Sequence, residues 1–132
     1  MNKKQYLKQG YRINLEIESK KEVLAELRAN LDGLKAIQLS EKLQGGQIPS
    51  DDNIVNRMSK IIEMEKQITQ LYDFQVELSE KIDKMKDPNE KLVLRYRYVL
   101  NLTWDQIADK MCYSLMNIHR IHKRALNNFK LL

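Results

Sequence analysis

The chain has 132 residues, of which 42% are hydrophobic and 31% charged, with four glycines and two prolines. This length allows one small domain, or a small domain with a helical arm, and excludes two full globular cores. The composition is typical of a folded, helix-rich protein and excludes a disordered chain. We therefore expect an all-α protein.

The sequence also limits where the protein works. No apolar run reaches the roughly 18 residues of a membrane-spanning helix, and Met1 to Gly10 lacks the apolar core of a secretory leader. The single cysteine, Cys112, cannot form an internal disulfide, which agrees with a reducing compartment. We expect a cytoplasmic protein without a membrane partner.

A heptad pattern predicts a long first helix. Apolar residues spaced by threes and fours run from Ile13 to Leu34, with Lys20 as the one polar member. The pattern ends before paired glycines and Ile48-Pro49, which disfavour a continuing helix. These features predict a helix over about 3–43 and a loop over about 44–52.

A second heptad series predicts another long helix. It runs from Ile61 to Met85 with Gln75 as the one polar member, which indicates a helix over about 53–86. Narrow apolar stripes bury little area unless they meet another helix. Residues 1–87 are therefore expected to form an arm that is an intrachain hairpin, an interchain coiled coil, or both, and we expect a homo-oligomer, most simply a dimer.

The net charge of +5 is concentrated near the C-terminus. Residues 1–89 hold 15 Lys and Arg against 15 Asp and Glu, whereas residues 90–132 hold 8 against 3. This division indicates that the front of the chain makes protein contacts and that the back meets a polyanion.

The last third of the chain predicts a helix-turn-helix. Asn89 to Leu100 reads as one helix, and Thr103-Trp104-Asp105-Gln106 fits a capping box that begins a second helix. Ser114 is a good N-cap for a third helix, only about three residues after the second one ends. This spacing indicates a helix-turn-helix domain over 88–132.

The third helix has two different faces at about 100° per residue. Its inner stripe is centred on Ile118 and includes Ile121, His122, Ala125 and Phe129. Its outer face carries only amides, cations and a methionine, namely Met116, Asn117, Arg120, Lys123, Arg124 and Asn127. A helix face without carboxylates suits the approach to DNA phosphates.

Residues 90–130 resemble the helix-turn-helix of sigma factor region 4, and more closely the phage regulators of the RinA and ArpU type. The resemblance lies in LVLRYRY, LTWDQIADKM, YS and IHRIHKRAL, in chain order. These regulators join a helical N-terminal part to such a module and act on late transcription. The resemblance departs at the turn, where a glycine is common and this chain has Cys112, and where an aliphatic residue is common and it has Tyr113. Cysteine tolerates a positive φ poorly, so we expect a slightly different turn.

The resemblance implies a set of DNA contacts. It places Leu115, Met116, Asn117 and Arg120 at base edges and Arg124 near the backbone. The arginine suits guanine, and Met116 suits the methyl group of thymine. The whole expected DNA-binding set is Thr103, Trp104, Ser114, Leu115, Met116, Asn117, His119, Arg120, Lys123, Arg124 and Asn127.

Other kinds of site are less well supported. Cys112, His119 and His122 suggest zinc, but structural zinc takes four ligands and a fourth is not evident, so we expect no metal. His122 is expected in the core and His119 beside the DNA face, and core packing is favoured over a sugar-phosphate contact for Trp104. No nucleophile-base pair, phosphate loop or pair of buried acids is discernible, so we expect no enzyme and no cofactor.

The resulting hypothesis is a sequence-specific regulator of phage or prophage transcription that binds double-stranded DNA, located with the nucleoid of a bacterial host cell. One alternative is a DNA-packaging protein such as a small terminase subunit. Another is a sigma-like factor that contacts RNA polymerase and scarcely binds DNA alone.

Overall fold

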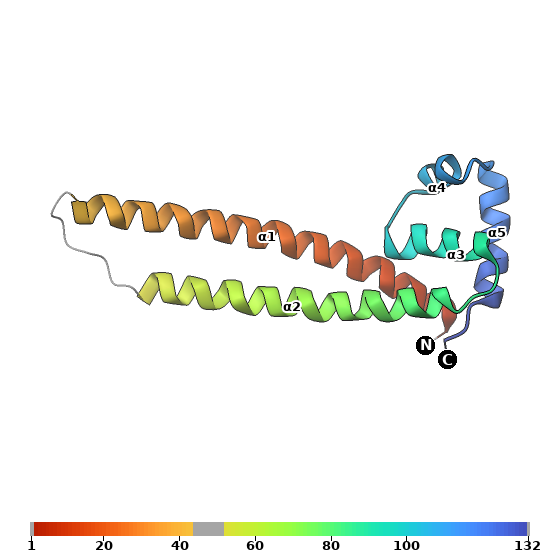
Figure 1. Cartoon of the computed structure of the whole chain (residues 1–132), viewed down its shortest axis with the longest axis horizontal. Helices are drawn as coiled ribbons and strands as arrows, with labels where there is room; N and C mark the ends of the chain where they lie inside the picture. Colours follow the sequence, from red (N-terminus) through yellow and green to blue (C-terminus); the bar gives the residue numbers. More distant parts are fainter. Residues whose placement is uncertain (1, 44–51, 132) are drawn as a thin grey trace. The chain divides into compact units, whose positions relative to one another are not determined.

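The computed structural model describes residues 2–43 and 52–131, and the side chains of residues 2–40 and 54–131. Within these ranges every regular element is a helix, so the protein is all-α as predicted (Figure 1). The predicted loop over 44–52 lies outside the described residues except for Asp52, the first residue of a helix. The elements are α1 (Lys3–Leu43), α2 (Asp52–Asp83), α3 (Pro88–Leu94), the π-helix η1 (Arg95–Val99), α4 (Trp104–Met111) and α5 (Leu115–Asn128).

The chain divides into two compact units. The hairpin unit contains residues 17–70, and the terminal unit contains residues 1–16 together with 71–132. Helices α1 and α2 each contribute to both units. The unit that contains the helix-turn-helix thus also includes the first turns of α1 and the last turns of α2.

In the hairpin unit, α1 and α2 pack along the predicted heptad stripes. Their buried side chains repeat at heptad spacing, and Lys20 Nζ donates a hydrogen bond of 2.9 Å to Gln67 Oε1. Arg28 forms an ion pair with Glu65 across the two helices. The seam therefore joins two helices of one chain. Its buried residues are Ile17, Leu24, Leu31, Ile61 and Ile68.

In the terminal unit, one apolar cluster joins both ends of the chain. Tyr6 and Leu7 of α1 pack with Leu78 of α2 and with Phe129, which directly follows α5. The rings of Tyr6 and Phe129 stack at 6.2 Å between centroids. Gly10 makes this approach close, because a Cβ atom there would lie 2.5 Å from Leu78 Cδ2. The buried face of α1 thus begins at Tyr6 and Leu7, before the heptad pattern that was predicted from Ile13 onward.

The predicted single helix over 89–100 is interrupted after Leu94 by the π-helix η1, where the Leu100 amide donates to the Arg95 carbonyl at 3.0 Å. Helix ends leave carbonyl groups without donors. Buried Asn14 supplies the donor here, because its Nδ2 donates to the carbonyls of Tyr98 at 2.7 Å and Val99 at 2.9 Å. Gln75 in turn donates to Asn14 Oδ1, so this polar member of the second series is a partner of Asn14.

A second apolar cluster holds the helix-turn-helix together. Val93 of α3 packs with Ile107 and Ala108 of α4 and with Ile118 and Ile121 of α5. Helix α3 begins at an N-cap, Asp87, whose Oδ1 accepts the amides of Asn89 and Glu90. This cluster fixes α5 against α3 and α4 through its buried side.

Candidate nucleic-acid interface

The start of α4 has the predicted capping box. Thr103 Oγ1 accepts the Gln106 amide at 3.2 Å, and Gln106 Oε1 accepts the Thr103 amide at 2.8 Å. These two bonds satisfy amides that have no partner within the helix. Thr103 itself is exposed, so it stands at the surface where α4 begins.

The turn between α4 and α5 keeps a left-handed residue although it lacks glycine. Cys112 has φ 58° and ψ 39°, and its amide points back to the carbonyls of Ala108 and Asp109. The expected departure from a glycine-type turn is therefore not seen, because hydrogen bonds to the end of α4 hold the cysteine in this conformation. The turn leads directly to Ser114, whose Oγ accepts the Asn117 amide at 3.1 Å.

Helix α5 is buried on one side only. Ile118, Ile121 and Ala125 are buried, as is Phe129 beyond the helix end, which agrees with the predicted inner stripe. The opposite side is open to solvent, and Met116 is 67% exposed and Leu115 42% exposed. The other exposed side chains of this side are Arg120, Lys123, Arg124 and Asn127, with Asn117 half-buried.

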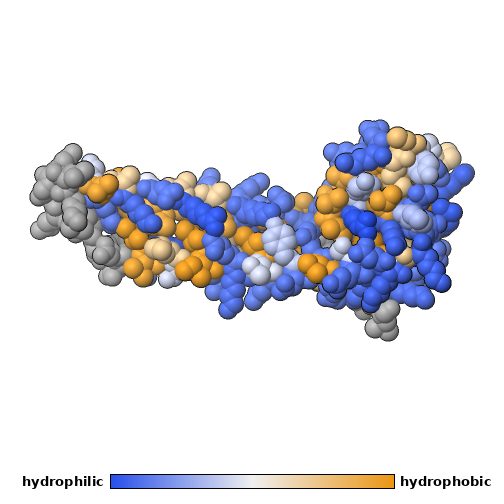
Figure 2. All heavy atoms as spheres, viewed as in Figure 1, coloured by the Kyte–Doolittle hydropathy of each residue, from blue (hydrophilic) through white to orange (hydrophobic). Residues whose placement is uncertain are grey.

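The exposed cations of α5 are not neutralised within the protein. Arg120, Lys123 and Arg124 form no ion pair with a carboxylate of the described residues. With Asn117 and Asn127 they border a shallow hollow of about 520 Å³. Figure 2 shows mostly hydrophilic side chains along α5. We call these five residues the α5 face.

Trp104 is turned toward the protein and not toward the α5 face. It packs half-buried against the second apolar cluster, with the Arg97 guanidinium 4.5 Å above its ring. Arg97 also lies 4.9 Å above the ring of Tyr11 and donates to the Leu102 carbonyl at 3.0 Å. This position agrees with the predicted core packing of Trp104.

The two histidines of α5 lie beside Trp104. His119 is exposed, and its ring centroid lies 5.0 Å from that of Trp104. His122 is half-buried and shares a hydrogen bond of 2.8 Å with the Tyr98 hydroxyl. Burial, together with the smaller effects of the charges of His119, Arg97 and Lys4, lowers the pKa of His122 to about 4. Burial also raises the pKa of Tyr98. His122 is therefore a neutral, packed group at neutral pH.

The structure adds basic residues that the sequence analysis did not place near α5. Lys3 Nζ donates to the Asn127 carbonyl at 2.8 Å, and the charge of Lys4 acts on His122. Both lysines come from the first turn of α1. The sequence did not indicate that these two lysines lie near α5, because residues 1–89 as a whole carry no net charge.

In the described ranges no group of three or more His, Cys, Asp or Glu side chains is arranged to hold a metal ion. In the same ranges no helix is long and apolar enough to cross a bilayer.

The comparisons with known proteins give a family without a known activity. A search of curated proteins and a search of solved structures each found no match. Residues 18–130 match the family described as "Protein of unknown function (DUF1492)". That match includes most of α1 and α2 and all the helices of the helix-turn-helix. The chain belongs to this family.

Proposed function

We propose that the protein is a sequence-specific, double-stranded DNA-binding regulator of transcription, of the phage or prophage type, and not an enzyme. The observation that carries this proposal is the α5 face. It presents unpaired cations and amides on a helix whose other side is fixed to two further helices by buried apolar contacts. A rigid helix with such a face is what major-groove recognition requires.

The dimensions of α5 agree with this role. A helix of 14 residues is about 21 Å long, whereas the major groove is about 12 Å wide. The first turns, with Leu115, Met116, Asn117 and Arg120, would enter the groove. The later turns, with Lys123, Arg124 and Asn127, would then lie near phosphates at its edge.

The proposal is tested by titrating labelled DNA. Duplexes are first selected from a genomic pool, and their affinity is then measured by fluorescence anisotropy for the wild type, Arg120→Ala and Lys123→Ala. Arg120→Ala should weaken binding by about 1–3 kcal/mol and relax the preference for one base pair. Lys123→Ala should weaken all sequences alike and make the salt dependence shallower by about one phosphate contact.

Arg57→Ala is the matched control. Arg57 is an exposed cation of α2 in the hairpin unit, so its loss changes the net charge equally but leaves the α5 face intact. The control should bind like the wild type. Unchanged binding by both α5 variants would overturn the assignment of this face.

We further propose that the protein self-associates through the hairpin unit. The heptad seam is used within the chain, but Val55, Met58 and Ile62 of α2 are exposed by 57%, 43% and 63%. These three residues fall within about 60° of one another around the helix. Light scattering of the wild type should give a dimer, and Ile62→Lys should give a monomer. A ring of eight or more subunits would favour a packaging protein instead.

A further inference from the structure

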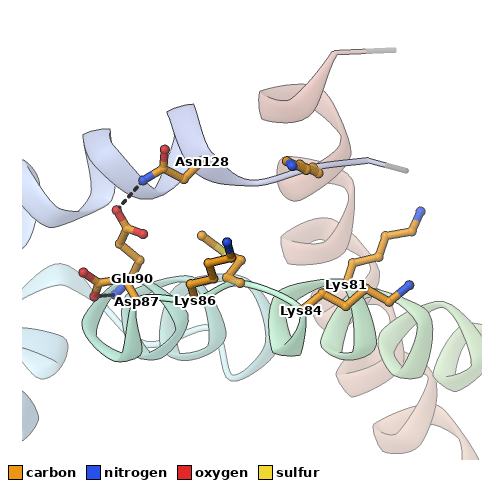
Figure 3. A pocket seen from close by; sticks show the side chains of 8 residues that line it. Lys81, Lys84, Lys86, Asp87, Glu90 and Asn128 are labelled. Carbon is orange, nitrogen blue, oxygen red and sulfur yellow. Dashed lines mark hydrogen bonds between the residues drawn. The ribbon is translucent and has the colours of Figure 1, made fainter.

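A cavity of about 570 Å³ lies in the terminal unit, and none of the residues that line it belongs to the α5 face. Figure 3 shows the side chains around it, which come from the end of α2, the segment between α2 and α3, the start of α3, the end of α5 and the segment after α5. Four of the side chains are lysines, Lys81, Lys84, Lys86 and Lys130. We call this cavity the lysine pocket.

The four lysines are not equally available. Lys81 is held in place, because its Nζ lies 3.0 Å from Glu77 Oε1 and 4.5 Å from the centroid of the Tyr6 ring. Lys84, Lys86 and Lys130 are exposed and form no ion pair with a carboxylate of the described residues. Three exposed cations therefore border the pocket without an ion pair, so they can attract an anionic group of a ligand.

The pocket also has groups that do not suit a free phosphate. Asp87 and Glu90 line it, and Glu90 is 4% exposed and accepts a hydrogen bond of 2.7 Å from Asn128 Nδ2. Figure 3 shows Glu90 reaching toward Asn128 beside Lys86. A phosphate would be repelled by these two carboxylates. A peptide would not, because its backbone amides donate to carboxylates while its acidic side chains accept from lysines.

The pocket has an apolar part as well. Met85 lines it and is 8% exposed, so its thioether is available only to a group that enters the cavity. Lysine stems add further apolar surface. Methionine adapts to side chains of different shape, as is common at surfaces that bind peptides.

We propose that the lysine pocket binds an acidic segment of a partner protein, with an apolar side chain against Met85 and carboxylates on Lys84, Lys86 and Lys130. This partner site is separate from DNA binding and does not depend on it. The protein would thereby join DNA to a second protein through two different surfaces of one unit.

The methionines allow a direct test. The full chain is labelled with ¹³C at its six methionine methyl groups, and Met85→Leu identifies the Met85 resonance. The probe is a short synthetic peptide that alternates leucine with aspartate and glutamate, and the control is the same peptide with asparagine and glutamine. The acidic peptide should shift the Met85 resonance in a saturable way. The amide peptide should bind at least about tenfold more weakly, as expected for the loss of one charge-assisted hydrogen bond.

The same sample separates this proposal from the DNA proposal. A selected DNA duplex should shift the resonance of Met116, which is on α5, and leave Met85 unchanged. A Met116 resonance that the duplex does not shift would contradict the DNA-binding proposal and leave the peptide site unaffected. A Met85 resonance that the acidic peptide does not move at millimolar concentration would overturn the peptide site, and so would an equal response to DNA or to inorganic phosphate.

Charge-reversal variants locate the binding. The double variant Lys84→Glu, Lys86→Glu should lose at least about tenfold in affinity for the acidic peptide, since charge-assisted contacts become repulsive. The matched control is Lys60→Glu, Lys66→Glu, two exposed lysines of α2 in the hairpin unit. An equal loss in both would show an effect of net charge only and overturn the site. If the first variant unfolds, as seen by Trp104 fluorescence, Lys130→Glu tests the same pocket from the segment after α5.

Discussion

The hairpin unit and the terminal unit share two helices but are stabilised in different ways. In the hairpin unit, buried residues repeat at heptad spacing along two stripes, and polar contacts such as that of Lys20 with Gln67 lie at the edge. In the terminal unit, apolar clusters and the buried amide of Asn14 join segments as distant in sequence as Asn14 and Tyr98. A repeated seam therefore tolerates the loss of one contact, whereas a core assembled from distant segments depends on each contact.

The largest expected effect separates the two units by their cores. Phe129→Ala should lower the free energy of unfolding by about 3–5 kcal/mol and abolish DNA binding, because Phe129 is fully buried in the cluster that joins α1 and α2 to the end of α5. Leu24→Ala should cost less, about 2–3 kcal/mol, because Leu24 is a smaller side chain and remains 8% exposed. Trp104 is the only tryptophan, so its fluorescence in urea reports the terminal unit. Equal losses of tryptophan-detected stability would contradict the difference between the units.

A smaller effect is expected from the buried amide. Asn14→Leu should lower the free energy of unfolding by about 1–3 kcal/mol, because the carbonyls of Tyr98 and Val99 lose their donor. Gln9→Leu is the matched control, since Gln9 is an exposed amide on the same helix. Urea unfolding and amide exchange near Val99 measure the change. Equal stability of the two variants would contradict a stabilising role for the Asn14 amide.

The pH dependence should also differ between the units. The pKa of His122 is about 4 in the folded chain and near 6.5 when unfolded, so the unfolded state binds more protons between these values. The stability that His122 contributes is fully present above pH 6.5 and is lost as the pH falls toward 4. His122→Phe should flatten this part of the profile measured by Trp104 fluorescence. An unchanged slope would assign the titration to another group.

The smallest expected effect is at the turn. Cys112→Gly should raise the free energy of unfolding by up to about 1 kcal/mol, because glycine adopts φ near 58° without steric cost. The affinity for DNA should stay the same, since Cys112 is outside the α5 face. Thermal unfolding followed by Trp104 fluorescence measures the change in stability, and fluorescence anisotropy measures the affinity for DNA. A loss of stability would mean that the cysteine side chain makes a contact worth more than the strain.

Much of the local structure was predictable from the sequence. The capping box of Thr103 and Gln106, the N-cap Ser114 and the inner stripe of α5 each depend on residues within a few positions of one another. The exposure of Arg120, Lys123 and Arg124 followed from the same periodicity. The left-handed Cys112 did not, because side-chain type alone disfavoured a conformation that the hydrogen bonds of the turn impose.

The sequence by itself thus determined the all-α class, the two heptad stripes and the composition of the α5 face, because each is set by interactions within one or two helical turns. Only the tertiary structure decided that the heptad helices pair within the chain and that Tyr6, Leu7 and Asn14 support the helix-turn-helix. It also decided that lysines from the end of α2, the segment after α2 and the segment after α5 border one cavity. Such contacts depend on how side chains from distant segments fit together in space, which periodicity and capping do not specify.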